Sequence, residues 1–189
     1  MDLVQRVQAI ILKPKDEWVK IKGEPTPVAR LFTSYAMVLA AIPPAAQFLG
    51  RLLFPPFRSF SASVGRALEY AVVAYIFALV AAYVFGFIIN ALAPNFSSPQ
   101  NLPNAMKLAV YSMTPGWIAG IINIIPRLSI LVTLASLYGL FVLYMGFDSP
   151  VMETPKDKVL GYLVVSVVVV IALMLVSGLI VGGIAFRML

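Results

Sequence analysis

Residues that could carry out chemistry are few in this chain. It has no cysteine and no histidine, which excludes thiolate nucleophiles, imidazole metal ligands and the usual proton carrier near neutral pH. Asp148, Glu153 and Asp157 could gather a hard cation through oxygen ligands. Lys156 and Lys158 largely balance their charge, so we interpret this segment as a solvated loop. We predict no catalytic residue, no metal site, no cofactor and no enzyme.

A second group of residues places prolines and polar side chains inside long apolar runs. Prolines interrupt the hydrogen bonds of a helix, and polar groups in an apolar run need a partner or water. A transport path is one interpretation, but hydrogen bonding between helices is favoured because no ionisable group lies at the centre of a run. The candidates for a kink or a polar path are Pro43, Pro44, Gln47, Tyr111, Pro115 and Asn123.

Two pairs of glycines have the spacing of close helix packing. Gly116 and Gly120 form one pair, and Gly178 and Gly182 form the other. Four residues apart, two glycines lie on one helical face and let another backbone approach closely. We favour packing within one subunit over dimerisation, because a bundle of several helices needs such faces for itself.

The elements that carry these residues are predicted to be membrane helices. Of the 189 residues, 61% are hydrophobic and 12% are charged, with a mean hydropathy of +0.94, whereas about 25% are charged in soluble domains. We predict an all-α polytopic membrane bundle of five transmembrane helices in one domain of residues 29–189. The third helix is short, so a re-entrant hairpin is its alternative, but its apolarity favours a crossing. The five helices are expected at about residues 29–53, 68–93, 108–125, 128–147 and 159–186.

Residues 1–28 are predicted to form an amphipathic, interfacial helical segment on the cytoplasmic side. Apolar residues recur there at helical spacing between polar ones. Trp18, with lysines on either side, is typical of an anchor at the level of the lipid head groups. A solvated helix that covers one end of the bundle fits the same pattern.

The distribution of positive charge predicts the orientation. With five crossings, the side of the N-terminal segment collects 9 cations, and the other side collects 5. We therefore expect a multi-pass protein of the cell (inner or plasma) membrane, with a cytoplasmic N-terminus and the C-terminus outside. Cations scattered around apolar runs do not indicate nucleic-acid binding. The 9 cations are Arg6, Lys13, Lys15, Lys20, Lys22, Arg30, Lys107, Lys156 and Lys158.

Several segments together resemble the YIP family (Ypt/Rab-interacting proteins), in particular its bacterial or archaeal members. The resemblance lies in LKPKDEWVKIKGEPTP from Leu12, YSMTPGWIAGIINIIP from Tyr111, LYGLFVLYMGF from Leu137, and Pro155 with Lys158. It implies five membrane spans and a cytoplasmic N-terminus. In eukaryotes it also implies vesicle traffic and contact with prenylated small GTPases, a role not expected to transfer to a prokaryotic member. By resemblance, structural roles are implied for Tyr111, Pro115, Gly116, Tyr138, Tyr144 and Gly146.

The sequence therefore predicts a non-enzymatic membrane protein that organises membrane proteins or lipids through helix packing and its N-terminal segment. Its expected partners are membrane lipids, together with a protein partner or further copies of the chain. The alternative is a small transporter or channel subunit with a polar path between kinked helices. A cavity at the midplane lined by Gln47, Tyr111 and Asn123 would favour transport, and a fully packed bundle would favour the organiser.

Overall fold

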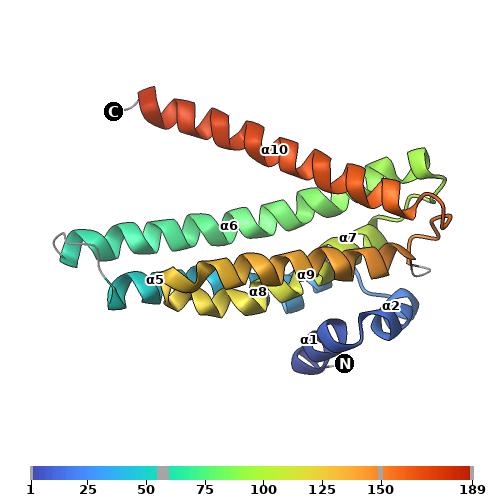
Figure 1. Ribbon diagram of the computed structural model, residues 1–189, viewed down its shortest axis with the longest axis horizontal. Helices are drawn as coiled ribbons and strands as arrows, with labels where there is room; N and C mark the ends of the chain where they lie inside the picture. Colours follow the sequence, from blue (N-terminus) through green and yellow to red (C-terminus); the bar gives the residue numbers. More distant parts are fainter. Residues whose placement is uncertain (1, 55–59, 149–150, 188–189) are drawn as a thin grey trace.

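The computed structural model describes residues 2–54, 60–148 and 151–187, and the side chains of these residues except 60–63, 66, 126, 173, 174 and 176–187 (Figure 1). The described residues form helices and turns, with no strand among them. Long helical segments lie side by side, and a short helical hairpin packs against one flank of the bundle (Figure 1). The all-α class predicted from the sequence is confirmed.

The N-terminal hairpin consists of α1 (Leu3–Leu12) and α2 (Pro14–Gly23). The side chain of Asp2 caps α1 by accepting a hydrogen bond from the backbone N–H of Leu3 at 2.7 Å. Pro14 opens α2 directly afterwards, since its missing N–H costs nothing at a first helical position. The two short helices are therefore joined by a sharp turn.

The first long segment of the bundle is interrupted twice. A turn at Ala41 separates two of its helices, and Pro43 lies in the first turn of the second. The kink expected from Pro43 and Pro44 is therefore a break between helices. A π-helical turn nearer the start was not foreseen. The elements are α3 (Val28–Leu31), the π-helix η1 (Phe32–Ala36), α4 (Met37–Ala40) and α5 (Ile42–Leu53).

The second segment, α6 (Phe60–Leu92), is the longest helix and runs back along the bundle. A 3-10 turn, η2 (Ala93–Phe96), ends it, and Ser97 follows in the left-handed region with a φ of 55°. The hydroxyl of Ser98 then forms a hydrogen bond with the hydroxyl of Thr154, with 3.1 Å between the two oxygens. The loops after the second and fourth segments are thus tied together at one end of the molecule.

The third segment runs from one end of the bundle to the other. It consists of α7 (Leu102–Ser112), α8 (Thr114–Ala119) and η3 (Gly120–Ile124). Near its start, the side-chain amide of Asn104 donates to the carbonyl oxygen of Val151 at 3.0 Å. At its far end, the backbone of Ile124 packs closely against Gly50 of α5. A Cβ atom on Gly50 would lie only 2.6 Å from the carbonyl oxygen of Ile124. The segment does not turn back as a re-entrant hairpin would.

The fourth and fifth segments complete the bundle. A short 3-10 turn, η4 (Pro126–Leu128), leads into α9 (Ser129–Asp148), and α10 (Val159–Arg187) follows after a loop. Figure 1 shows α10 diverging from α6 toward the C-terminus. The five long segments alternate in direction, so the end of α10 lies far from the N-terminal hairpin.

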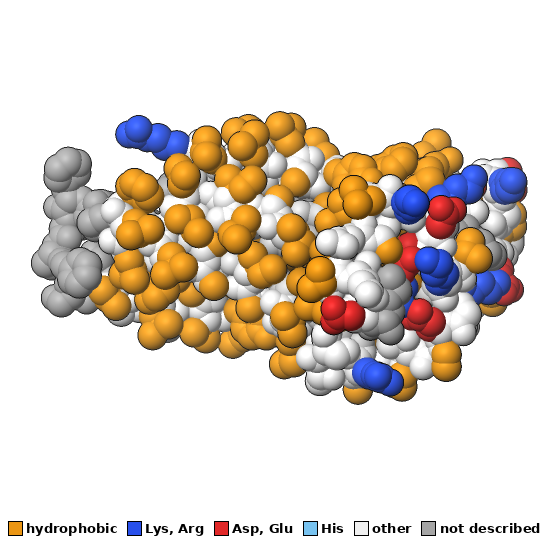
Figure 2. All heavy atoms as spheres, turned by 90° about the horizontal axis from the view of Figure 1, so that it is seen from below, with side chains coloured by type: hydrophobic (Ala, Val, Ile, Leu, Met, Phe, Trp, Pro, Cys, Tyr) orange, Lys and Arg blue, Asp and Glu red, His pale blue; other side chains and the backbone are white. Residues whose placement is uncertain are grey.

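Most of the bundle surface is apolar. Val73 is 60% exposed, Ile76 is 55% exposed and Ile130 is 61% exposed. Figure 2 shows apolar side chains covering the length of the bundle, with charged side chains gathered mainly at the end that carries the hairpin. Exposing such a surface to water is unfavourable, whereas the acyl chains of a bilayer can surround it. Three described segments are long and apolar enough to cross a bilayer, namely Val28–Leu53, Ala67–Phe96 and Ser129–Asp148.

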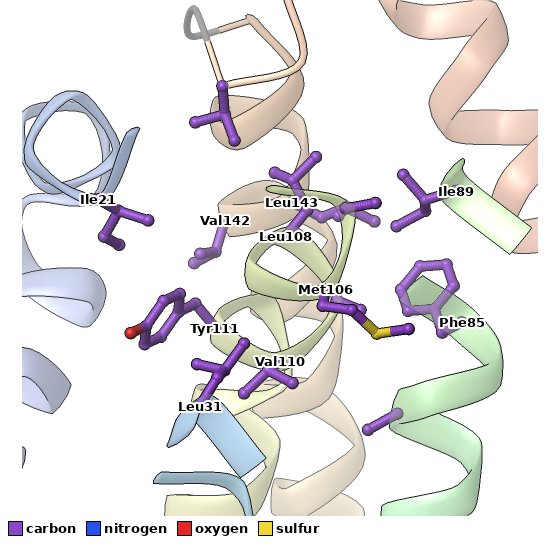
Figure 3. Packing of buried hydrophobic residues seen from close by; sticks show 14 of the residues in the cluster. Ile21, Leu31, Phe85, Ile89, Met106, Leu108, Val110, Tyr111, Val142 and Leu143 are labelled. Carbon is purple, nitrogen blue, oxygen red and sulfur yellow. The ribbon is translucent and has the colours of Figure 1, made fainter. Parts of the chain in front are cut away.

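The core of the protein is built around α7. Every residue from Ala105 to Ser112 is buried, so this helix has neighbours on all sides. Figure 3 shows Met106 facing Phe85 of α6, while Tyr111 points toward the N-terminal helices. A Cβ atom on Gly86 would lie 3.0 Å from the Cα atom of Met106, so this glycine lets α6 approach closely.

Candidate functional site

Trp18 attaches the N-terminal hairpin to the bundle. Its side chain is 0% exposed, and its Nε1 donates a hydrogen bond to the carbonyl oxygen of Val142 in α9 at 3.0 Å. Its ring meets Tyr111 edge to face, with 6.1 Å between centroids. A Cβ atom on Gly146 would lie 2.8 Å from Cε2 of the indole, so the glycine makes room for it. The structure buries this indole within the protein, where its polar N–H finds a partner. The depth of Trp18 at the level of the lipid head groups stays a prediction.

An ion-pair network holds the two helices of the hairpin together. The guanidinium of Arg6 in α1 contacts the carboxylates of Glu17 in α2 and of Glu24 just after it. The side chains of Arg6 and Glu17 are 5% and 1% exposed, so each buried charge needs the other. Burial alone would lower the pKa of Arg6, but the hydrogen bond to Glu24 and the surrounding groups outweigh burial and hold this pKa above its usual value.

Lys107 connects the end of α2 to the core helix α7. The residue is 3% exposed, and its Nζ donates to the carbonyl oxygens of Ile21 at 3.0 Å and Glu24 at 2.6 Å. Each of these carbonyls also accepts one backbone hydrogen bond, Ile21 from Glu24 at 3.3 Å and Glu24 from Thr26 at 2.9 Å, and a cation is favourable at the C-terminus of a helix. Lys107 therefore caps α2 from another part of the chain. The charge distribution in the sequence identifies Lys107 only as a loop cation. The sequence signal for its buried role is that it is a lone lysine inside an apolar run.

The outer face of the hairpin exposes apolar side chains between lysines. Val4, Leu12 and Val19 are 56%, 75% and 58% exposed. The hydroxyl of Tyr138 donates to the carbonyl oxygen of Ile11 at 2.7 Å. Tyr138 precedes the end of α9 by ten residues, which corresponds to about 15 Å along a helix. The end of α1 therefore lies alongside the middle of α9, within the apolar surface of the bundle.

A polar cavity of about 470 Å³ lies between the hairpin and the first long segment. We call it the polar cavity. Four charged residues line it, and four residues line it with hydroxyl groups. The charged residues are Asp2, Arg6, Glu24 and Arg30, and the hydroxyl-bearing residues are Thr26, Ser34, Tyr35 and Tyr111.

A second cavity of about 430 Å³ lies within the bundle, and we call it the bundle cavity. Pro43, Gln47 and Asn123 line it, together with apolar and hydroxyl side chains, and no charged residue is among the described residues of its lining. Tyr111 lines the polar cavity instead, and the two linings share no residue. The structure thus brings together three of the six candidates for a polar path. Pro44 and Pro115 are both buried outside these linings.

The first glycine pair lies between segments of the same chain. A Cβ atom on Gly116 would lie 2.8 Å from Oγ of Ser136 in α9, and one on Gly120 would lie 2.7 Å from Cβ of Pro43 in α5. Gly116 therefore faces α9, and Gly120 faces α5. Gly178 and Gly182 belong to α10 where the surroundings are outside the described residues, so their packing stays a prediction.

The carboxylates considered as cation ligands do not gather into a cluster. Within the described part of the chain, no group of three or more acidic side chains could hold a metal ion. Glu153 instead pairs with Lys22 of the hairpin, with 3.0 Å between Oε1 and Nζ. This pair adds a tie between the hairpin and the loop before α10.

Comparison with known proteins supplies the family. A family model, the Yip1 domain, matches residues 9–178, which includes the end of α1, all of α2 and most of the bundle. No curated protein and no solved structure matches the chain. The matching family consists of non-enzymatic membrane proteins. The resemblance stated from the sequence is therefore confirmed: this chain belongs to the Yip1 domain family and is a multi-pass membrane protein.

Proposed function

We propose that this protein is a five-span membrane protein of the cell membrane that organises lipids or other membrane proteins through its N-terminal hairpin. The observation that carries this proposal is the two-sided hairpin. Its inner face is fixed to the core by Trp18, while Val4, Leu12 and Val19 on the outer face have no cover among the described residues. An exposed apolar face beside lysines suits a membrane surface or a membrane-bound partner.

The alternating direction of the five segments supports five crossings, and the charge distribution supports a cytoplasmic hairpin. The third segment extends from the loop around Val151 to the neighbourhood of Gly50, so its ends lie at opposite ends of the bundle. α10 has 29 residues, which corresponds to about 43 Å as a helix and is sufficient for a bilayer core of about 30 Å. The positive-inside rule then places the end with the hairpin in the cytoplasm.

Co-purification tests the organising role. The protein and its Val4→Ser/Val19→Ser variant are extracted from native membranes, and the bound proteins and lipids are compared by mass spectrometry. Since both side chains point away from the core, we expect the variant to keep its thermal stability and to lose part of the bound set. The control is Val73→Ser, which removes an equally exposed apolar side chain from α6. An unchanged bound set in the hairpin variant would contradict the proposal.

A transport function is the second candidate, and the bundle cavity favours it. Gln47 and Asn123 come from different segments and line this one cavity. Tracer flux into vesicles containing the purified protein tests it, with Asn123→Leu as the variant. Flux that this substitution abolishes would favour transport over organisation. Of the three residues whose shared cavity would favour transport, Gln47 and Asn123 line the bundle cavity, and Tyr111 lines the polar cavity.

A further inference from the structure

We propose that the polar cavity binds the head group of a phospholipid that carries both a phosphate and a primary ammonium group, as in phosphatidylethanolamine. This inference rests on the proposed membrane function in one respect: the first long segment must cross the bilayer for a lipid to reach the cavity. The cavity combines donors without protein partners, balanced charge and a wall on the exposed face of a span candidate, and these properties together point to a zwitterionic lipid.

Two donors in the cavity lack protein partners. Tyr111 is 5% exposed, and its hydroxyl has no hydrogen bond to another described residue, whereas the hydroxyl of Tyr35 is 2.8 Å from that of Thr114. Figure 3 shows the Tyr111 hydroxyl pointing out of the core toward the N-terminal helices. Arg30 lines the same cavity, and its guanidinium forms no ion pair with the described residues. Both residues line the cavity, Arg30 as an exposed side chain and Tyr111 as a nearly buried one, so both donors are free to bind a ligand there, and a phosphate oxygen is a strong acceptor for each.

The charges of the lining favour a zwitterion over a simple anion. Arg6 and Arg30 are opposed by Asp2 and Glu24, so the four side chains have no net charge. Arg6 is already bound to Glu17 and Glu24, which leaves Arg30 for the phosphate. A carboxylate has about four lone-pair sites, so Asp2 and Glu24 can still accept hydrogen bonds from an ammonium group.

The cavity also lies where a lipid can reach it. Arg30 and Ser34 belong to the exposed face of the span candidate Val28–Leu53. Ser34 follows the start of this span by six residues, a depth of about 9 Å along a helix. On the next turn, Met37 and Val38 are 42% and 49% exposed, which provides an apolar track for acyl chains. The π-helix η1 forms this wall of the cavity, and such turns are frequent at functional sites.

Binding is measured on the detergent-purified full chain by following its thermal midpoint during titration with short-chain lipids. We expect short-chain phosphatidylethanolamine to raise the midpoint and to saturate. Arg30→Gln and Tyr111→Phe should each weaken this binding, Arg30→Gln by about tenfold, because it removes a charge-assisted hydrogen bond. The matched controls are Arg127→Gln on the exposed turn η4 and Tyr83→Phe on the exposed face of α6, and these should bind as the unmodified chain does.

Two further ligands separate the parts of the proposal. Short-chain phosphatidylglycerol keeps the phosphate but lacks the ammonium group, and soluble phosphoethanolamine keeps both but lacks acyl chains. Both should bind more weakly than phosphatidylethanolamine. Equal binding of phosphatidylglycerol would overturn the role of Asp2 and Glu24, equal binding of phosphoethanolamine would overturn the lipid, and unchanged binding in both variants would overturn the site. Since only purified protein and lipid are used, failure here is distinct from failure of the co-purification experiment.

Discussion

The indole nitrogen of Trp18 and the carbonyl oxygen of Val142 lie 3.0 Å apart, although 124 residues separate them in the sequence. This hydrogen bond joins the N-terminal hairpin to the fourth long segment. It makes the hairpin part of the folded core, with only its outer face free to meet the membrane surface.

The first prediction concerns the environment of Trp18. In the Trp117→Phe variant, where Trp18 is the remaining tryptophan, we expect emission at short wavelength and weak quenching both by acrylamide and by lipids labelled near the head group, because the side chain is 0% exposed. The comparison is Val19→Trp in a Trp18→Phe/Trp117→Phe background, since position 19 is 58% exposed. Strong shallow quenching of Trp18 would place the indole at the head groups and disprove its burial.

The second prediction concerns the buried ion pair. Arg6→Met leaves the carboxylate of Glu17, which is 1% exposed, without its guanidinium partner. We expect the free energy of unfolding in detergent to fall by about 3–5 kcal/mol, the usual cost of breaking a buried pair from one side. Lys20→Met removes a partner that is 63% exposed and should change it by less than about 1 kcal/mol.

The double variant Arg6→Met/Glu17→Met separates charge burial from packing. Because neither charge remains in the core, it should recover most of the stability lost in Arg6→Met. A double variant as unstable as the single one would show that the shape of the arginine, and not its charge, holds the hairpin.

The third prediction concerns the close approach at Gly120. Its Cβ atom in Gly120→Ala would lie 2.7 Å from Cβ of Pro43, so the two segments must move apart. Overpacking of this kind typically costs about 1–3 kcal/mol, and the thermal midpoint in detergent should fall. The matched control is Gly65→Ala, where a Cβ atom meets nothing within 4 Å. If both variants unfold at the same temperature as the unmodified chain, the glycine does not limit the packing.

The fourth prediction concerns topology. We expect a reporter fused to the N-terminus to be active on the cytoplasmic side and one fused to the C-terminus to be active across the membrane, because the cations divide 9 to 5 and the number of segments is odd. Both reporters on one side would mean that one of the five segments does not cross.

The sequence by itself determined the fold class, the family and the approximate segments. Long apolar runs in a chain with 12% charged residues leave only helices as membrane elements, because backbone groups must be satisfied within each segment. The boundaries of α9 are predicted almost to the residue, since Pro126 and Asp148 mark its ends chemically. The third segment starts earlier than predicted because Asn101 caps α7 through the N–H of Asn104 at 3.1 Å.

Only the tertiary structure decided where the N-terminal hairpin lies and which polar residues meet. Helical periodicity shows that one face of the hairpin is apolar, but a lipid surface and a protein surface satisfy that face equally well. The decisive contacts join residues far apart in the chain, such as Lys107 with the carbonyl of Ile21, 86 residues away. Likewise, Tyr111 and Asn123 belong to one segment yet line different cavities. Such pairings depend on how whole segments pack, and no local pattern encodes them.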